Sequence, residues 1–123
     1  MLAFVVMPDH IHALLRPEPG APISRVIAFI KHVSMKAIRA YGHPSQVWEE
    51  RFYNRVMRDE DELRNAIAYI HANPVRAGLC PEERQWRWST ANALVPSDLE
   101  ALTTHWNAAA SPSAGWSPQD SEI

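Results

Sequence analysis

Cysteine is almost absent from this chain, because Cys80 is the one cysteine among its 123 residues. No disulfide can form within the chain, and this composition is typical of proteins in a reducing compartment. No apolar run approaches the roughly 20 residues that a transmembrane helix needs, and the N-terminus lacks the basic region and cleavage site of a secretory signal. We therefore expect a cytoplasmic protein with no membrane partner.

The sequence also lacks a strong net charge, since its formal charge is −2 at pH 7. Two regions lack charge of one sign. No lysine or arginine follows Arg87, and no acidic residue occurs in residues 23–42. Residues 1–90 therefore carry 12 basic and 10 acidic side chains. This weakly basic region is compatible with a partner that bears phosphates, but it does not indicate one by itself.

Two histidines flank one apolar residue in the motif His10-Ile11-His12. The apolar stretches 2–6 and 10–15 predict strand on either side of Pro8, which implies a bulge, an edge or a bend. Because side chains alternate between the faces of a strand, His10 and His12 would project from the same side. Such a pair can bind one divalent metal, although a core strand with two incidental histidines explains the same pattern.

Two helices are expected from apolar residues at a spacing of 3.6. The first covers 23–42 and stops at Gly42, after the proline-rich loop 16–22. Its basic residues lie mostly off the apolar stripe, which indicates either a solvated face or a surface for phosphates. The second helix opens at Asp59 with a capping box and should end near Asn73, because the residue before Pro74 disfavours helix.

Between and after these helices the sequence predicts less regular structure. The β-branched and aromatic stretch 47–57 predicts a strand, whose aromatic side chains either join the core or stack on bases. The cluster 86–90 is expected to hold the C-terminal segment on the core. Residues 1–95 are interpreted as one domain, and 96–123 as a disordered or loosely docked tail.

Tyr69 and Asn73 are four residues apart and are therefore neighbours on one face of the second helix. A half-buried tyrosine and a helix C-terminal asparagine are ordinary features. An amide oxygen is also a ligand for a hard cation, and a phenol one turn away can act as a nucleophile at that metal. The spacing alone leaves both interpretations open.

Four segments together resemble the REP-associated tyrosine transposases, a branch of the single-tyrosine HUH transposases. In chain order they are 6–15, Trp48 with 52–63, 69–79 and 86–89. The resemblance covers roughly residues 1–90, and the conjunction of motifs is more specific than any one of them.

This resemblance implies roles for individual residues. Tyr69 matches the catalytic tyrosine, and His10, His12 and Asn73 match the ligands of a divalent metal, Mg²⁺ or Mn²⁺. The implied activity is cleavage and rejoining of single-stranded DNA, recognised through a hairpin with a flanking guide sequence, by way of a 5′-phosphotyrosine. A homodimer is implied as well. Candidate DNA-binding residues are Arg25, Lys31, Lys36 and Arg55.

The implied fold is α+β, with a ferredoxin-like antiparallel sheet and helices packed on one face. Family members have a strand and a helix before the His-x-His strand, whereas this chain begins within that strand. We therefore expect an N-terminally truncated member. Two other functions stay open: an inactive relic or regulator that binds DNA hairpins, and a metal hydrolase that uses His10, His12 and another histidine such as His43.

Overall fold

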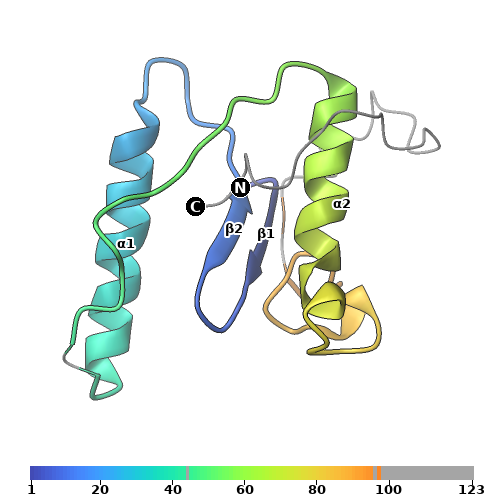
Figure 1. The fold of residues 1–123 in the computed structure, drawn as a ribbon. Coiled ribbons are helices and arrows are strands. Elements are labelled where there is room, and N and C mark those ends of the chain that lie inside the picture. The colour runs from blue at the N-terminus through green and yellow to red at the C-terminus, as the bar shows by residue number, and fades with distance from the viewer. Residues whose placement is uncertain (44, 96, 98–123) are drawn as a thin grey trace. The chain divides into compact units, whose positions relative to one another are not determined.

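The computed structural model describes residues 1–43, 45–95 and 97. Its elements in chain order are β1 (Ala3–Val6), β2 (Ile11–Leu14), α1 (Ile23–Ala40), α2 (Glu60–Arg76) and the short 3₁₀ helix η1 (Glu83–Gln85) (Figure 1). The two strands form an antiparallel sheet, which confirms the predicted α+β class. The chain divides into two compact units: Arg16–Phe52, and Met1–Leu15 together with Tyr53–Ile123.

The strands β1 and β2 form a hairpin whose chain reversal lies at Pro8 and Asp9. Proline has no N–H to give to a ladder, so the bend falls where the sequence predicts an interruption. The expectation that the chain begins within the strand of the two histidines is wrong. A separate strand, β1, precedes β2, and Val5 pairs with His12 across the hairpin.

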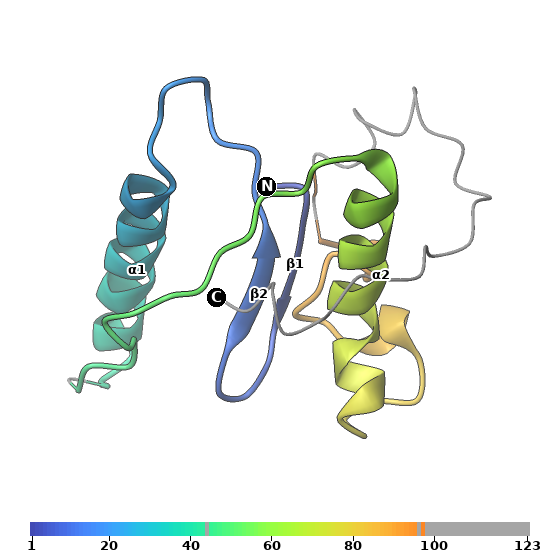
Figure 2. The ribbon, with the colours of Figure 1, turned by 45° about the horizontal axis from the view of Figure 1, so that its top comes forward.

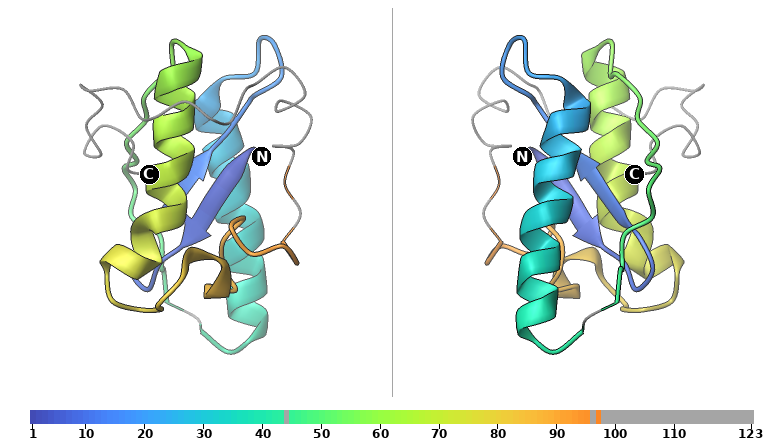
Figure 3. Two further views of the ribbon diagram at one scale, coloured as in Figure 1. Left: turned by 90° about the vertical axis from the view of Figure 1, so that its right-hand side faces the viewer. Right: turned by 90° about the vertical axis from the view of Figure 1, so that its left-hand side faces the viewer.

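The helix α2 packs on the hairpin and closes the core of its unit (Figure 3). Alternation along the strands places one side of each against the core, because side chains in a strand point to opposite faces in turn. From α2, Ala66 and Ile70 are buried, and Leu63 and Ile67 pack against them, as the helical spacing predicts. The buried hydrophobic residues from the strands and their flanks are Leu2, Ala3, Val5, Met7 and Leu14.

The segment after η1 runs along the outer edge of β1 (Figure 2). Ser89 forms a bridge with Val5, the amide of Val6 donates to the carbonyl of Trp88 at 2.8 Å, and the Trp86 indole donates to the carbonyl of Val6 at 2.9 Å. These bonds satisfy backbone groups that an edge strand would otherwise expose. The expected attachment of 86–90 to the core is confirmed.

The helix α2 begins as predicted but ends three residues later than predicted. Asp59 is the N-cap, and its carboxylate accepts from the amide of Glu62 at 2.8 Å. The helix continues through Pro74 to Arg76. Its end is set instead by Gly78 at φ 72°, where the amide of Gly78 donates to Val75 and that of Leu79 donates to Pro74. This Schellman pairing supplies the hydrogen bonds that favour three further helical residues.

The unit Arg16–Phe52 contains α1, which starts and stops close to the predicted bounds. The predicted strand at 47–57 is wrong, because these residues carry no ladder. Side chains of α1 bind this segment instead. The ammonium of Lys31 donates to the carbonyl of Glu49 at 2.6 Å, and the Trp48 indole donates to the hydroxyl of Ser34 at 2.8 Å.

The predicted tail at 96–123 lies, apart from Ser97, outside the described residues. Over the residues that are described, neither helix has the combination of length and apolar character that crossing a membrane requires.

Candidate active site

The imidazoles of His10 and His12 meet at the start of β2. Their Nε2 atoms are 3.1 Å apart, and the rings are perpendicular with centroids separated by 4.8 Å. His12 is 1% exposed within the strand, whereas His10 lies just before it and is partly exposed. Two ring nitrogens therefore face the same point from one side of the hairpin.

The carboxylate of Asp9 fixes the orientation of His10. Its Oδ1 lies 2.6 Å from Nδ1 of His10, and this hydrogen bond lowers the pKa of Asp9 below its ordinary value. A proton held on Nδ1 leaves the lone pair on Nε2, the atom that faces His12. No role for Asp9 is evident from the sequence, because adjacent residues in a strand point to opposite sides; the bend brings the two groups together.

Tyr69 approaches this pair from α2. Its ring centroid is 5.4 Å from that of His12, with an angle of 80° between the planes. Ile70, the next residue of α2, is buried in the core, and Tyr69 is half-buried beside it. The packing of α2 on the hairpin thus brings together groups that are far apart in the sequence.

Asn73 lies one turn beyond Tyr69 on α2 and is half-buried. Its amide nitrogen donates to the carbonyl of Tyr69 at 3.0 Å. This bond orients the side chain and leaves the amide oxygen as an acceptor. The structure therefore joins His10, His12 and Tyr69 by direct ring contacts, and ties Asn73 to Tyr69 by a hydrogen bond.

A cation that the sequence did not indicate also lies beside the Tyr69 ring. The guanidinium carbon of Arg76 is 5.3 Å from the ring centroid, a cation–π distance. Arg76 could not be singled out beforehand, because the helix was expected to end at Asn73. Only a helix that continues past Pro74 places Arg76 on the same face as Tyr69.

His71 is close in sequence but serves another contact. Its Nε2 lies 2.9 Å from the hydroxyl oxygen of Thr90, and burial lowers the pKa of the imidazole below its ordinary value. This side chain is engaged with the C-terminal segment, so it is not the base that a phenol nucleophile would need.

The donor set of the imidazole pair fits a divalent cation. Two neighbouring ligands of an octahedral ion, each at about 2.1 Å, are roughly 3 Å apart, and the two Nε2 atoms are separated by 3.1 Å. Within the part of the chain that the structure describes, no third histidine, cysteine, aspartate or glutamate completes a metal-binding group with them. Asn73, one turn beyond Tyr69 on α2, carries a neutral amide oxygen of the kind that binds hard cations.

The four residues predicted to bind nucleic acid occupy different environments. Arg25 and Lys36 are exposed on α1. Lys31 is bound to the carbonyls of Glu49 and Glu50, and Arg55 forms an ion pair with Glu62 at 2.8 Å. Of these four residues, therefore, Arg25 and Lys36 are the two that are exposed and not bound to another residue in the contacts given above.

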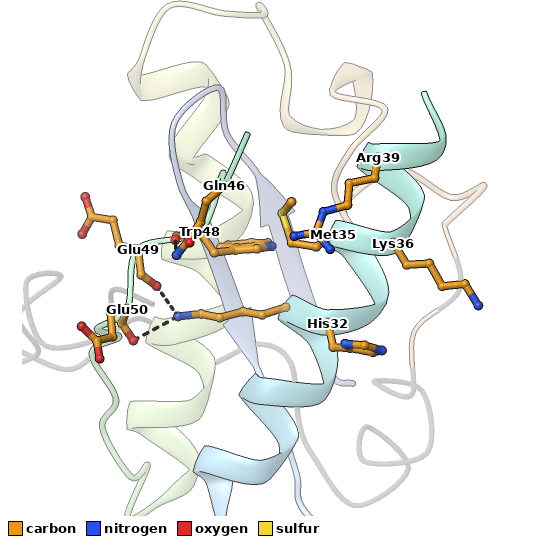
Figure 4. Close-up of a pocket in the computed structure, with 9 residues that line it drawn as sticks. His32, Met35, Lys36, Arg39, Gln46, Trp48, Glu49 and Glu50 are labelled. Carbon is orange, nitrogen blue, oxygen red and sulfur yellow. Dashed lines mark hydrogen bonds between the residues drawn. The ribbon is translucent and has the colours of Figure 1, made fainter. Parts of the chain in front are cut away.

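A shallow cavity of about 470 Å³ adjoins α1 in the unit Arg16–Phe52. In Figure 4, Trp48 and Met35 point toward each other across it, whereas the Lys36 side chain extends outward. Glu49 and Glu50 lie on the side of the cavity opposite Lys36 and Arg39, and the ammonium of Lys31 reaches their backbone carbonyls. The rim of the cavity therefore carries both acidic and basic side chains, and none of the residues that line it is His10, His12 or Tyr69.

Comparison with protein families identifies the chain. The family model described as "Transposase IS200 like" matches residues 1–73, more than half of the sequence. The chain belongs to the IS200-like transposase family. The matched region of this transposase-family chain contains His10, His12, Tyr69 and Asn73, and Arg76 lies beyond it.

Two curated relatives agree with this assignment. An Escherichia coli protein named REP-associated tyrosine transposase is 28% identical over 112 residues, which cover 86% of this chain and 66% of the relative. A Haemophilus influenzae protein, assigned by name to the same group, is 28% identical over 109 residues, covering 80% of this chain and 62% of the relative. The chain thus spans just under two thirds of the length of these relatives. No solved structure gives a significant match.

Proposed function

We propose that this chain of the IS200-like transposase family cleaves and rejoins single-stranded DNA, with Tyr69 as the nucleophile. The observation that supports this function best is the contact chain from His10 to His12 to Tyr69. It supports the proposal because a tyrosine ring contacts an imidazole pair whose nitrogens suit a cation, and a phenol nucleophile and a cation are the two components of phosphoryl transfer through a covalent intermediate.

The proposed reaction exchanges one phosphodiester bond for another. The phenol oxygen of Tyr69 attacks the phosphorus, the bond from phosphorus to the 3′ oxygen breaks, and a 5′-phosphotyrosine and a 3′-hydroxyl result. The phenol gives up its proton to solvent and the departing oxygen takes one up, so no net proton is consumed. Because the free energy of the phosphodiester is retained in the tyrosine bond, another 3′-hydroxyl can reseal the strand without ATP.

In this proposal His10, His12 and Asn73 hold a divalent cation, Mg²⁺ or Mn²⁺. When bound, such a cation polarises the phosphate and stabilises the charge that develops during transfer. The protein positions the ligands: Asp9 orients one imidazole, the strand buries the other, and the backbone of α2 holds the amide.

The proposed substrate is a DNA hairpin with a flanking guide sequence. Arg25 and Lys36 of α1 support this, because the helix carries no acidic residue and these two cations are exposed. Lys31 and Arg55 contribute less, since both already bind oxygen atoms of the protein. A homodimer remains a prediction from the family resemblance.

The test uses the covalent intermediate itself. The purified chain is incubated with Mg²⁺ or Mn²⁺ and a pool of single-stranded hairpin oligonucleotides with randomised flanks, and protein–DNA adducts are detected after denaturation. We expect an adduct with the wild type and with the control Tyr53→Phe, whose ring is 67% exposed. With Tyr69→Phe the adduct should fall to background, while hairpin binding persists.

Two other outcomes would contradict the proposal. Hairpin binding without an adduct in the wild type would indicate a relic or regulator that recognises DNA without turnover. Cleaved ends free of protein, formed equally by Tyr69→Phe, would indicate a metal hydrolase. His43 gains no support as a ligand for such an enzyme, since the described residues contain no group of three histidine, cysteine or acidic side chains placed to hold a metal ion.

A further inference from the structure

The guanidinium of Arg76 occupies a position beside the candidate nucleophile that nothing in the proposed function yet uses. It lies over the Tyr69 ring, 5.3 Å from the centroid, while the His12 ring meets Tyr69 edge-on at 5.4 Å. The phenol is thus flanked by a cation from its own helix and by an imidazole from the hairpin.

The placement follows from the length of α2. Residues seven apart on a helix lie almost on the same side, since seven residues make nearly two turns of 3.6. Tyr69 and Arg76 have this spacing, and Asn73 lies between them on the same face. The Schellman pairing that ends the helix at Gly78 fixes the last turn, so the backbone under Arg76 is defined.

The charge of Arg76 is available to a ligand. The residue is exposed, and among the described residues its guanidinium takes part in no ion pair. Arg55, Arg64 and Arg84 of this unit are each paired with a carboxylate, whereas Arg87 lies over the ring of Trp88, which is not part of the candidate site. Attraction to the helix C-terminus accounts for a cation in the last turn, but not for a guanidinium held over this ring.

We infer that Arg76 binds the phosphate that Tyr69 attacks, and keeps that phosphate as a partner once it is bonded to the tyrosine. A guanidinium presents several N–H donors that match phosphate oxygens in pairs, and its charge opposes that of the phosphate before and after transfer. This inference rests on the proposed function. It adds an anion-binding group that needs neither a metal nor a base.

The test reads the Arg76 side chain directly and without turnover. The Nε–H signals of the arginines are recorded by NMR in the metal-free wild type, and that of Arg76 is identified by its loss in Arg76→Lys. An oligodeoxythymidine strand is then added. We expect the Arg76 signal to shift with the same saturation curve as binding measured by fluorescence anisotropy, and the signal of Arg84, assigned by Arg84→Lys, to stay in place. An unmoved Arg76 signal at saturation would overturn the inference.

A second measurement counts the phosphate contact. For single strands, each neutralised phosphate contributes about 0.7 to the slope of log K against log salt concentration. We expect Arg76→Gln to reduce this slope by about 0.7 and the matched control Arg84→Gln to leave it unchanged. An equal slope in Arg76→Gln and wild type would contradict the contact. Failure of Tyr69 to form an adduct would not change either measurement, so a failure of the proposed function can be distinguished from a failure of this inference.

Discussion

At the scale of single residues, Asp9 decides which nitrogen of His10 faces the site. Its carboxylate holds the proton on Nδ1, so that Nε2 carries the lone pair toward His12. Carboxylates that bond the far nitrogen of a ligating histidine orient the ring and make it a stronger ligand. Asp9 is exposed, and the value of its bond lies in orientation rather than in stability.

We expect Asp9→Asn to weaken metal binding, on the proposed function, by about tenfold or more, as loss of such outer partners does elsewhere. The asparagine can still accept from Nδ1 but no longer supplies a charge. Titration of Mn²⁺ by calorimetry measures the change, with Glu18→Gln as a control for removal of an exposed carboxylate. Equal Mn²⁺ affinity in Asp9→Asn and wild type would contradict this role.

The sequence predicts part of the candidate site for a clear reason. His10 and His12 are related by strand period, and Tyr69 and Asn73 by helix period, so local geometry pairs them correctly. Asp9 and Arg76 were missed because each depends on the end of an element. Asp9 acts from the bend of the hairpin, and Arg76 from a turn of helix that the local rule about Pro74 excludes.

At the scale of elements, the start of α2 is held by a side-chain cap, which the start of α1 lacks. Asp59 caps the amide of Glu62, and the carboxylate of Glu62 in turn accepts from the amide of Arg58 and from the guanidinium of Arg55. Three acidic residues in the first turn also favour the positive end of the helix. This network joins the segment before the helix to its first turn.

We expect Asp59→Ala to lower the free energy of unfolding by about 1 kcal/mol, because the amide of Glu62 loses its acceptor. Asp59→Asn should lose much less, since asparagine caps a helix nearly as well. Urea denaturation of the three proteins measures the difference. If Asp59→Ala and Asp59→Asn lower the free energy of unfolding equally, the hydrogen bond of the cap contributes nothing, and only the charge of Asp59 matters.

The two errors at this scale have different physical causes. Pro74 stays inside α2 because backbone bonds three to five residues downstream close the last turn, and the segment 47–57 stays out of a sheet because Lys31 and Ser34 bind it. The rule for the residue before a proline does not take the closing bonds at Gly78 into account, and strand propensity does not take partners on α1 into account. The helix starts are predicted correctly because the residues of the first turn determine them.

At the scale of the unit that holds the site, one hydroxyl links three segments. Oγ1 of Thr90 accepts from the amide of Phe4 in β1 and lies 2.9 Å from Nε2 of His71 in α2. The C-terminal segment, the hairpin and the helix therefore meet at one polar contact beside the core. Protonation of His71 works against this arrangement, since burial disfavours its charged form.

We expect stability to fall as pH falls through the ordinary histidine range. The pKa of His71 is lowered in the folded chain from its ordinary value of 6.5. As the pH falls below the pKa of the unfolded state, His71 of the unfolded chain binds a proton while His71 of the folded chain still resists one. The free energy of unfolding therefore decreases until the pH reaches the lower pKa of the folded state. Urea denaturation at about pH 7.5 and about pH 5.5 measures the loss.

The matched variant is His71→Gln, whose amide can still bond to Thr90. It should lose less stability over the same pH interval, because the contributions of the other histidines are common to both proteins. An equal loss of stability in the two proteins would show that the pKa of His71 does not differ between the folded and unfolded states.

The candidate site is divided between the hairpin and α2, and the ring contact of His12 with Tyr69 exists only while the helix is seated on the strands. Any ion or strand that bridges the two halves must then bind the folded chain in preference to the unfolded one. Mass action makes such a ligand a stabiliser, by roughly 2.7 kcal/mol at a hundred times its dissociation constant. A melting curve can therefore report occupancy of this site before any substrate sequence is known.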